Sequence, residues 1–139
     1  VGAWVALREE ISFTSLLLGA AVVFWLIGFD ILYACMDVEA DRKNQLHSIP
    51  ERFGIETALK IAFASHAVMV IFLLVLWEPT VLLGWVYLSG VALVAGLLVY
   101  EHSLIKKDDL SKVNMAFFNV NGIISLGLMA FGIVDCIWV

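Results

Sequence analysis

The sequence predicts an all-α fold: a polytopic bundle of helices that cross a membrane four times. The first observation behind this prediction is composition, because 63% of the 139 residues are hydrophobic and only 15% are charged, against about a quarter in a soluble domain. The second is the presence of four long apolar segments, each near the ~20 residues that a spanning helix needs. The third is that the basic residues gather between these segments. Together they indicate an integral membrane protein.

The four segments are expected to form helices at residues 11–36, 57–77, 80–101 and 111–137. Runs this long and continuous favour helices over barrel strands, since every backbone polar group in lipid must be paired within the chain. Ser12 and Thr14 are candidate N-caps of the first helix. Glu78-Pro79 ends the second helix and leaves a very short turn, so the second and third helices should be antiparallel neighbours.

The basic residues set the predicted orientation. One face of the membrane receives seven of the eight: Arg42, Lys43, Arg52, Lys60, Lys106, Lys107 and Lys112. Arg8 alone falls on the other side. By the positive-inside rule, the face with seven is cytoplasmic. The sequence has no basic stripe that would meet phosphates, which argues against nucleic acid as a partner.

A cluster of carboxylates follows the first segment and enters a cytoplasmic loop expected at residues 37–56. Asp37 and Asp41 are four apart, so on a continuous helix they share one face, and Asp30 and Tyr33 extend the same stripe inward. Something positive should offset the repulsion between these acids. Mg²⁺ fits, because it is held by one or two carboxylates plus substrate phosphates. The alternative is a solvated acidic helix end beside the bilayer, and spacing alone does not decide between the two.

The rest of this loop is too patterned for a plain linker. Several basic side chains are placed to surround an anion near such a metal: Arg42, Lys43, His47 and Arg52. Ordinary positive-inside charge is the alternative explanation for them. The segment from Ser48 to Glu51 resembles a capping box with proline in the first turn. Gly54 would end that short helix in a left-handed cap.

Polar residues also occur within and beside the later segments. In the fourth, a polar and aromatic stripe follows helical spacing: Asn114, Phe117, Asn121 and Ser125. Such a stripe lines a cavity or forms interhelical hydrogen bonds, and both uses remain open. His66 is expected to make a helix–helix contact. Asp108 and Asp109 are expected to cap the fourth helix rather than to form a second metal site. For Asp135, near the outer boundary, interfacial solvation is a sufficient explanation.

The start of the chain and its cysteines lead to two further expectations. The first residue is Val1 rather than Met, and residues 1–7 resemble the end of an apolar segment. We therefore expect a piece of a longer protein that lacks its N-terminal part. Cys35 and Cys136 fall on opposite sides of a core roughly 30 Å thick. A disulfide needs Cα atoms within about 7 Å, so both thiols should be free.

The acidic loop also carries a family resemblance. Asp30-x-x-Tyr33-Ala34-x-x-Asp37-x-x-x-Asp41-Arg42, followed by His47-Ser48-Ile49-Pro50-x-Arg52-Phe53-Gly54, resembles the second aspartate-rich motif of the UbiA superfamily of membrane prenyltransferases. Tyr100-Glu101-His102 and the segment from Asp109 to Gly122 resemble its 4-hydroxybenzoate polyprenyltransferase branch. The resemblance covers nearly the whole chain, and the long combined motif is far more specific than an isolated DxxxD.

The resemblance implies a fold of about nine transmembrane helices around a central cavity. In that family two aspartate-rich motifs at the cytoplasmic mouth hold Mg²⁺ and a polyprenyl diphosphate. This chain has the second motif and lacks the first, which is of the NDxxDxxxD type. Its four helices therefore resemble the last four of the fold, residues 1–139 forming the C-terminal part of one domain and half an active site. We expect a bacterial inner membrane protein that faces the cytoplasm and needs its missing N-terminal helices.

Carried over residue by residue, the resemblance implies a role for each candidate site residue. Asp37 and Asp41 would be the catalytic Mg²⁺ ligands. The diphosphate would be held by Arg42, Lys43 and Arg52. The substrate cavity would be lined by Asp30, Tyr33, Asn114, Phe117 and Asn121. The implied reaction is Mg²⁺-dependent transfer of a polyprenyl group from polyprenyl diphosphate to an aromatic acid such as 4-hydroxybenzoate, in quinone biosynthesis. The alternatives are a naphthoate-type acceptor of menaquinone biosynthesis and a transporter segment that is not an enzyme.

Overall fold

The computed structural model describes residues 1–80, 82–106 and 109–138, with the side chains of 115–117 also outside the description. Its elements in chain order are α1 (Gly2–Arg8), α2 (Phe13–Ala34), α3 (Val38–Lys43), α4 (Ile49–Phe53), α5 (Ile55–Trp77), α6 (Trp85–Leu104), α7 (Val113–Met115), the π-helical turn η1 (Ala116–Val120) and α8 (Asn121–Trp138). The described part contains helices and no named β-strand. The predicted all-α class is therefore confirmed.

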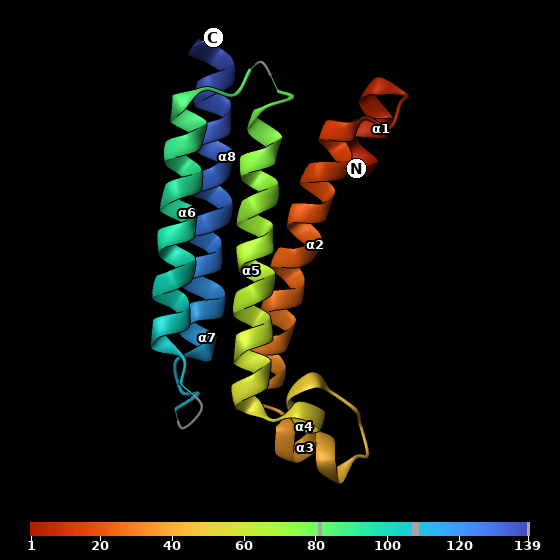
Figure 1. The fold of residues 1–139 in the computed structure, drawn as a ribbon, viewed down its shortest axis with the longest axis vertical. Coiled ribbons are helices and arrows are strands. Elements are labelled where there is room, and N and C mark those ends of the chain that lie inside the picture. Colours follow the sequence, from red (N-terminus) through yellow and green to blue (C-terminus); the bar gives the residue numbers. More distant parts are fainter. Residues whose placement is uncertain (81, 107–108, 139) are drawn as a thin grey trace.

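Four helices are long and apolar enough to cross a membrane: Phe13–Ala34, Ile55–Trp77, Trp85–Leu104 and Phe118–Trp138. In Figure 1, α5 lies between α2 and the pair formed by α6 and α8. The short helices α3 and α4 lie at one end of the long helices, as does the loop that follows α6, and both termini lie at the other end (Figure 1). The two connecting segments thus share an end (Figure 1), as the sequence predicted, and they carry Arg42, Lys43, Arg52, Lys106 and Lys112. Lys60 lies in the first turns of α5, and Lys107 lies outside the described residues.

Side-chain caps fix where two of the helices begin. At the start of α2, the Ser15 backbone N–H donates to Ser12 Oγ at 3.1 Å, and the Ser12 N–H donates back to Ser15 Oγ at 3.3 Å. Ser48 begins α4 in the same way, since its Oγ accepts from the Glu51 N–H at 3.4 Å. Gly54 then ends α4 and precedes α5 with a φ of 82°. Its ψ of 154° lies outside the left-handed helical region that we expected, but the positive φ still favours glycine.

The connection between α5 and α6 is longer than the sequence prediction, because α6 begins at Trp85 and not near residue 80. Gly84 occupies the N-cap position and has no side chain to cap the helix. Asp135 of α8 supplies the cap instead: its Oδ2 accepts from the Gly84 N–H at 2.8 Å and from the Tyr87 N–H at 2.6 Å. Asp135 is 3% exposed. The interpretation of Asp135 as a solvated interfacial residue was therefore wrong, because its carboxylate binds the positive end of a neighbouring helix.

We expect Asp135→Ala to destabilise the α6–α8 pair. The change leaves two buried N–H groups without an acceptor, at a cost of about 1–3 kcal/mol. The measurement is the midpoint of unfolding in mixed micelles as the fraction of dodecyl sulfate rises. Asp135→Asn, which keeps one acceptor oxygen, should lose less than the alanine variant. Replacing the exposed neighbour Cys136 by alanine should change nothing, and equal midpoints for all three variants would contradict the capping role.

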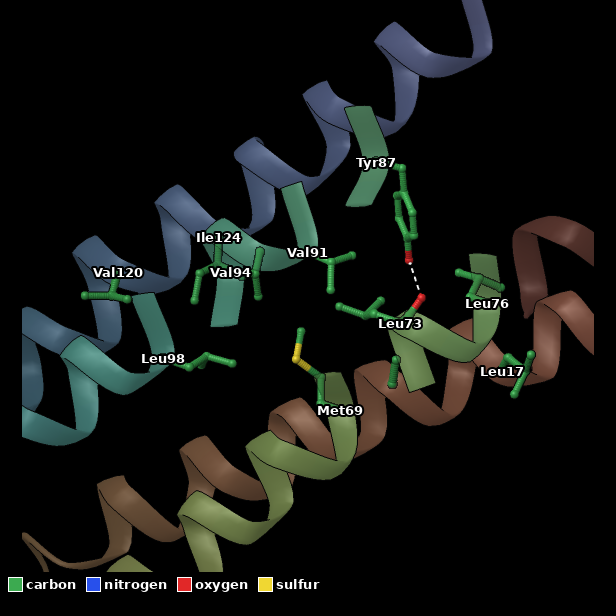
Figure 2. Packing of buried hydrophobic residues seen from close by; sticks show 11 residues of the cluster. Leu17, Met69, Leu73, Leu76, Tyr87, Val91, Val94, Leu98, Val120 and Ile124 are labelled. Atoms are coloured by element: carbon green, nitrogen blue, oxygen red, sulfur yellow. Dashed lines mark hydrogen bonds between the residues drawn. The ribbon is translucent and has the colours of Figure 1, made fainter. Parts of the chain in front are cut away.

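The larger core cluster ties the four long helices together (Figure 2). It contains Leu17, Ala21, Met69, Leu73, Leu76, Tyr87, Val91, Val94, Leu98, Val120 and Ile124. Within it, the Tyr87 hydroxyl donates to the Leu73 carbonyl at 2.9 Å, which joins α6 to α5 (Figure 2). A second cluster lies nearer the short helices and includes Phe29, Leu32, Cys35 and Val113. This second cluster supports the end of the bundle that carries the acidic loop.

The predicted helix over 111–137 is not continuous. A π-helical turn, η1, separates α7 from α8. Because a π-helical turn contains more residues than an α-helical one, residues on the two sides of η1 do not keep regular α-helical spacing. The expectation of one stripe at regular α-helical spacing was therefore wrong. Just before α7, Asp109 Oδ1 accepts from the Ser111 hydroxyl at 2.5 Å and from the Ser111 N–H at 3.1 Å. The hydroxyl contact first, and then the backbone contact, lowers the pKa of the Asp109 carboxyl.

Two further sequence predictions concern the cysteines and Asp108. Cys35 is buried, Cys136 is exposed, and both are free thiols, as predicted. Asp108, the other candidate cap of the fourth helix, lies outside the described residues. The burial of Cys35 raises the pKa of its thiol to about 11. A raised pKa makes the thiolate of Cys35 less populated, which disfavours nucleophilic attack by this buried thiol.

Candidate functional site

Three acidic side chains line one cavity where α2 gives way to α3. The cavity measures about 420 Å³ and is lined by Asp30, Tyr33, Ala34, Asp37 and Asp41. We call it the acidic cavity. The helix that the sequence predicted through these residues is interrupted, because α2 ends at Ala34 and α3 starts at Val38. A tight turn keeps the stripe together: the Asp37 N–H donates to the Ala34 carbonyl at 3.1 Å.

Among the described residues, no salt bridge neutralises the carboxylates of the acidic cavity. The salt bridges found in the described part of the chain join His47 to Glu51 at 3.7 Å and Lys60 to Glu56 at 2.9 Å. Neither involves an acid of this cavity. Carboxylates that share a cavity without an ion-paired base repel one another. Binding of an oxygen-seeking cation would relieve that repulsion.

The donors present fit Mg²⁺ better than a metal that needs a complete protein cage. Across the described residues, no group of three or more His, Cys, Asp or Glu side chains could hold a metal ion. Mg²⁺ does not require such a group, since it keeps several waters and binds one or two carboxylates together with substrate phosphates. Asp37 and Asp41 could supply that pair of carboxylates, and Asp30 lines the same cavity.

The basic residues predicted to hold diphosphate do not line the acidic cavity. Arg42 lines a separate cavity of about 610 Å³ that also involves Cys35 and Pro50. Arg52 lines a third, of about 510 Å³, with His47 and Glu51. The Arg52 guanidinium lies 5.5 Å from the centre of the Phe53 ring, and Lys43 is exposed. The structure thus places Arg42 and Arg52 in other cavities than Asp37 and Asp41, although all four lie in the same segment of the chain.

A smaller cavity of about 230 Å³ adjoins the acidic one. Its lining consists of Trp25, Leu26, Phe29 and Asp30 from α2 and Asn121 from α8. Two residues predicted to line a substrate cavity, Asp30 and Asn121, are therefore brought together across the bundle.

The other two predicted cavity residues of the fourth segment are not placed there. Asn114 is exposed on α7. Phe117 belongs to η1, and its side chain lies outside the described residues.

His66 joins three helices behind this small cavity. Its Nε2 lies 3.2 Å from the Trp25 carbonyl oxygen, and its Nδ1 lies 3.0 Å from Nε2 of His102. A carbonyl only accepts, so Nε2 of His66 carries the proton, and Nδ1 of the neutral ring accepts from the His102 N–H. The predicted helix–helix role of His66 is confirmed. Its ring lies directly against Gly28 of α2, where a Cβ would overlap its Cδ2 and Nε2 atoms.

Sequence reasoning missed two buried polar residues of this end of the bundle. His102 entered the sequence analysis only through the resemblance of Tyr100-Glu101-His102 to a family motif, yet it pairs with His66 across 36 residues of sequence. Glu101 is 0% exposed, and its two carboxylate oxygens have no hydrogen-bond partner among the described residues. Glu101 follows Leu98 at a spacing of three on the inner face of α6. That spacing predicts burial of Glu101, but charged side chains are rarely buried, so the residue type predicts exposure.

The fold and the acidic cavity define a multi-pass membrane protein with a carboxylate-lined cavity at one end of its helices. The chain belongs to the UbiA prenyltransferase family, whose family model matches residues 1–123.

Its relatives include three proteins named 4-hydroxybenzoate octaprenyltransferase. The one from Cupriavidus metallidurans is 32% identical over 124 residues, or 86% of this chain and 40% of the relative. The one from Burkholderia mallei is 29% identical over 132 residues, covering 92% and 45%. The one from Citrobacter koseri is 30% identical over 129 residues, covering 93% and 43%. This chain therefore spans less than half the length of the relatives it matches. No solved structure shows significant similarity to it.

Proposed function

We propose that this chain forms part of an Mg²⁺-dependent prenyltransferase that moves a polyprenyl group from polyprenyl diphosphate to an aromatic acid. The observation that carries the proposal is the acidic cavity at the end of membrane-spanning helices, in a chain of this family. The names of the relatives favour 4-hydroxybenzoate as the acceptor, which would place the reaction in ubiquinone biosynthesis. The basic residues gathered at this end favour a cytoplasmic site, in a bacterial inner membrane.

In this proposal each part of the site has a distinct task. Asp37 and Asp41 would hold Mg²⁺, which when bound supplies a Lewis acid for the leaving diphosphate. Arg42, Lys43 and Arg52 of the same loop would attract the diphosphate electrostatically. As the allylic C–O bond breaks, positive charge develops on the prenyl carbon. Tyr33 lines the cavity where that charge develops and could stabilise it with its ring face.

The proposed reaction ends with attack by the aromatic ring. An electron-rich ring carbon ortho to the phenolic oxygen forms a bond to the prenyl carbon, and the proton on that ring carbon is then lost to a base. Water that reached the prenyl cation would react with it in place of the aromatic ring. The apolar residues that surround this end of the bundle, among them Phe29 and Leu32, exclude water from it.

We further propose that the complete enzyme contains additional helices that come before this chain. The basis is the length comparison, since the chain covers 40–45% of the relatives described above. The apolar side chains that α8 exposes, such as Leu126 and Met129, would face lipid or those helices. We use "complete enzyme" below for this chain together with the preceding helices.

Two alternatives remain distinct from this proposal. A naphthoate-type acceptor would keep the chemistry and change only the ring. A transporter segment would need polar residues along the whole membrane depth. The cluster from Leu17 to Ile124 instead fills the bundle with apolar side chains beyond the acidic end, which favours an enzyme.

The test is prenyl transfer in oriented membrane vesicles. Inverted vesicles containing the complete enzyme should transfer a labelled geranyl group, from a diphosphate that does not cross the membrane, to 4-hydroxybenzoate when Mg²⁺ is present. Right-side-out vesicles should not, because the site would face their interior. A dihydroxynaphthoate acceptor tests the first alternative in the same assay. This chain expressed alone should be inactive. Transfer from the outer face, or Mg²⁺-independent transfer, would contradict the proposal.

A further inference from the structure

Asp30 lies where two cavities meet, and it has no chemical task in the reaction proposed above. It lines the acidic cavity, and it also lines the cavity of about 230 Å³ between α2 and α8. We call the second one the interhelical cavity; it is lined by Trp25, Leu26, Phe29, Asp30 and Asn121. Groups bound in the two cavities would therefore both lie next to Asp30.

The carboxylate of Asp30 is open to such groups. Asp30 is exposed, and no salt bridge or side-chain hydrogen bond in the described part of the chain involves it. The polar side-chain atoms Nε1 of Trp25 and Oδ1 of Asn121 are buried instead, so they offer nothing to a group in the interhelical cavity. Among the described residues that line this cavity, Asp30 alone is charged. The interhelical cavity thus combines apolar walls with one accessible carboxylate.

Asp30 also stands apart from the two carboxylates proposed to hold Mg²⁺. It belongs to the spanning helix α2 and lies roughly 6 Å along the helix axis before the last residue, Ala34. Asp37 is the N-cap of α3, and Asp41 lies on that helix. Mg²⁺ bound together with a diphosphate takes one or two protein carboxylates, which Asp37 and Asp41 supply. Asp30 is therefore left without a ligand role, beside the reacting groups.

The proposed reaction requires a proton acceptor beside the aromatic ring. When the allylic C–O bond breaks, its electron pair leaves with the diphosphate, and a ring carbon ortho to the phenolic oxygen bonds to the prenyl carbon. That ring carbon still carries its hydrogen, so the ring is a cation until the proton leaves and the C–H electron pair restores aromaticity. A carboxylate held within reach can accept such a proton. The leaving diphosphate is a poorer acceptor, because the positive groups that hold it stabilise its unprotonated form.

We propose that Asp30 is the base that removes the proton from the acceptor ring. The ring would occupy the interhelical cavity between Leu26 and Phe29, with the prenyl diphosphate in the acidic cavity. The volume of about 230 Å³ lies below the ~300–1,000 Å³ of most ligand pockets, which suits one ring rather than a polyprenyl chain. Asp30 takes the proton from the attacked carbon and, being exposed, passes it to water. This assignment rests on the proposed function and deepens it.

The experiment compares 4-hydroxybenzoate with the same acid carrying deuterium at both carbons ortho to the hydroxyl. Initial rates of labelled geranyl transfer are measured for the complete enzyme in inverted vesicles, with Mg²⁺ and acceptor both saturating. The wild type should use the two acids at nearly equal rates, because proton loss is fast when a base is in place. Asp30→Asn should lower the rate about 10²–10⁴-fold, the usual contribution of a general base. The deuterated acid should then react more slowly than the normal acid, since proton loss has become the slow step.

Matched variants separate a base from a structural residue and from a metal ligand. Asp30→Glu keeps a carboxylate, so it should retain much of the rate and show no isotope effect. Glu39→Gln removes a carboxylate from the neighbouring cavity and should match the wild type in both measurements. Asp30→Asn should reach half-maximal rate near the wild-type Mg²⁺ concentration, whereas the residual activity of Asp37→Asn should need more Mg²⁺. If Asp30→Asn has no measurable activity, added formate should restore transfer to Asp30→Ala by replacing the missing carboxylate.

The outcomes separate this inference from the proposed function. An isotope effect that is larger in Asp30→Asn than in the wild type supports the inference. A slow Asp30→Asn with the wild-type isotope effect overturns it, because the residue would then be structural or the diphosphate would take the proton. A raised Mg²⁺ requirement in Asp30→Asn, or an inactive Asp30→Ala that formate does not restore, also overturns it. These results leave the proposed function intact, whereas a wild type without Mg²⁺-dependent transfer to 4-hydroxybenzoate overturns the proposed function and the inference with it.

Discussion

Asp37→Ala should remove nearly all Mg²⁺-dependent prenyl transfer from the complete enzyme. Asp37 and Asp41 line the same cavity and have no salt bridge among the described residues, so their charge is free to hold a cation. Groups that stabilise charge developing in a transition state typically contribute about 10²–10³ in kcat, and a metal ligand should contribute at least as much. Asp37→Asn should be nearly as damaging, because it preserves shape and removes charge.

Glu39→Gln is the matched control for this prediction. Glu39 lies in the first turn of α3, two residues after Asp37, and is also exposed, but it lines the neighbouring cavity with Arg42. Removing its charge should therefore leave activity within about twofold, as surface substitutions generally do. The measurement is the initial rate of transfer as a function of Mg²⁺ concentration. Near-normal turnover in Asp37→Ala, or an equal loss in Glu39→Gln, would show that the acidic cavity does not hold the metal.

The acidic cavity could be predicted from the sequence because its residues are close along the chain. Spacings of three, four and seven place side chains together on a helix, and Asp30, Tyr33 and Asp37 follow them. The break after Ala34 did not undo the arrangement, since the turn that follows is tight. The caps at Ser12 and Ser48 could also be predicted from the sequence, because each depends on a residue three positions away.

The contacts between helices could not be predicted in this way. His66 pairs with His102 across 36 residues, and Asp135 caps α6 across 51 residues from Gly84. In a soluble helix, an apolar stripe marks the face that packs inward. Here the spanning helices are apolar all round, because lipid accepts the outward face as readily as a neighbouring helix does. The sequence therefore indicates four helices without indicating which of their faces meet.

The prediction of a regular polar stripe in the fourth segment was wrong for a related reason. A regular stripe from Asn114 to Asn121 assumes a continuous α-helix, and nothing in the local sequence signals the π-helical turn between them. Only the structure shows that Asn121 joins Trp25 and Asp30 while Asn114 is exposed.

Gly28→Ala should have the largest effect on stability of any small substitution in the spans. A methyl group at position 28 would overlap the His66 ring, which is 2% exposed and bonded to both His102 and the Trp25 carbonyl. Relieving the overlap requires the ring to leave its bonds or α2 to move away from α5. Overpacking of this kind costs about 1–3 kcal/mol, and each lost interhelical hydrogen bond adds about 0.6 kcal/mol.

Gly96→Ala separates this clash from the general effect of adding a methyl group to a helix. A Cβ at Gly96 of α6 would meet no atom within 4 Å, and glycine is about 1 kcal/mol worse than alanine inside a helix. Gly96→Ala should therefore be neutral or stabilising in the dodecyl sulfate titration of the complete enzyme, where Gly28→Ala unfolds early. Adding His66→Ala to Gly28→Ala removes the overlapping ring, so the double variant should be no less stable than His66→Ala alone. If Gly28→Ala matches Gly96→Ala instead, α2 and α5 do not pack as closely as the Gly28–His66 contact requires.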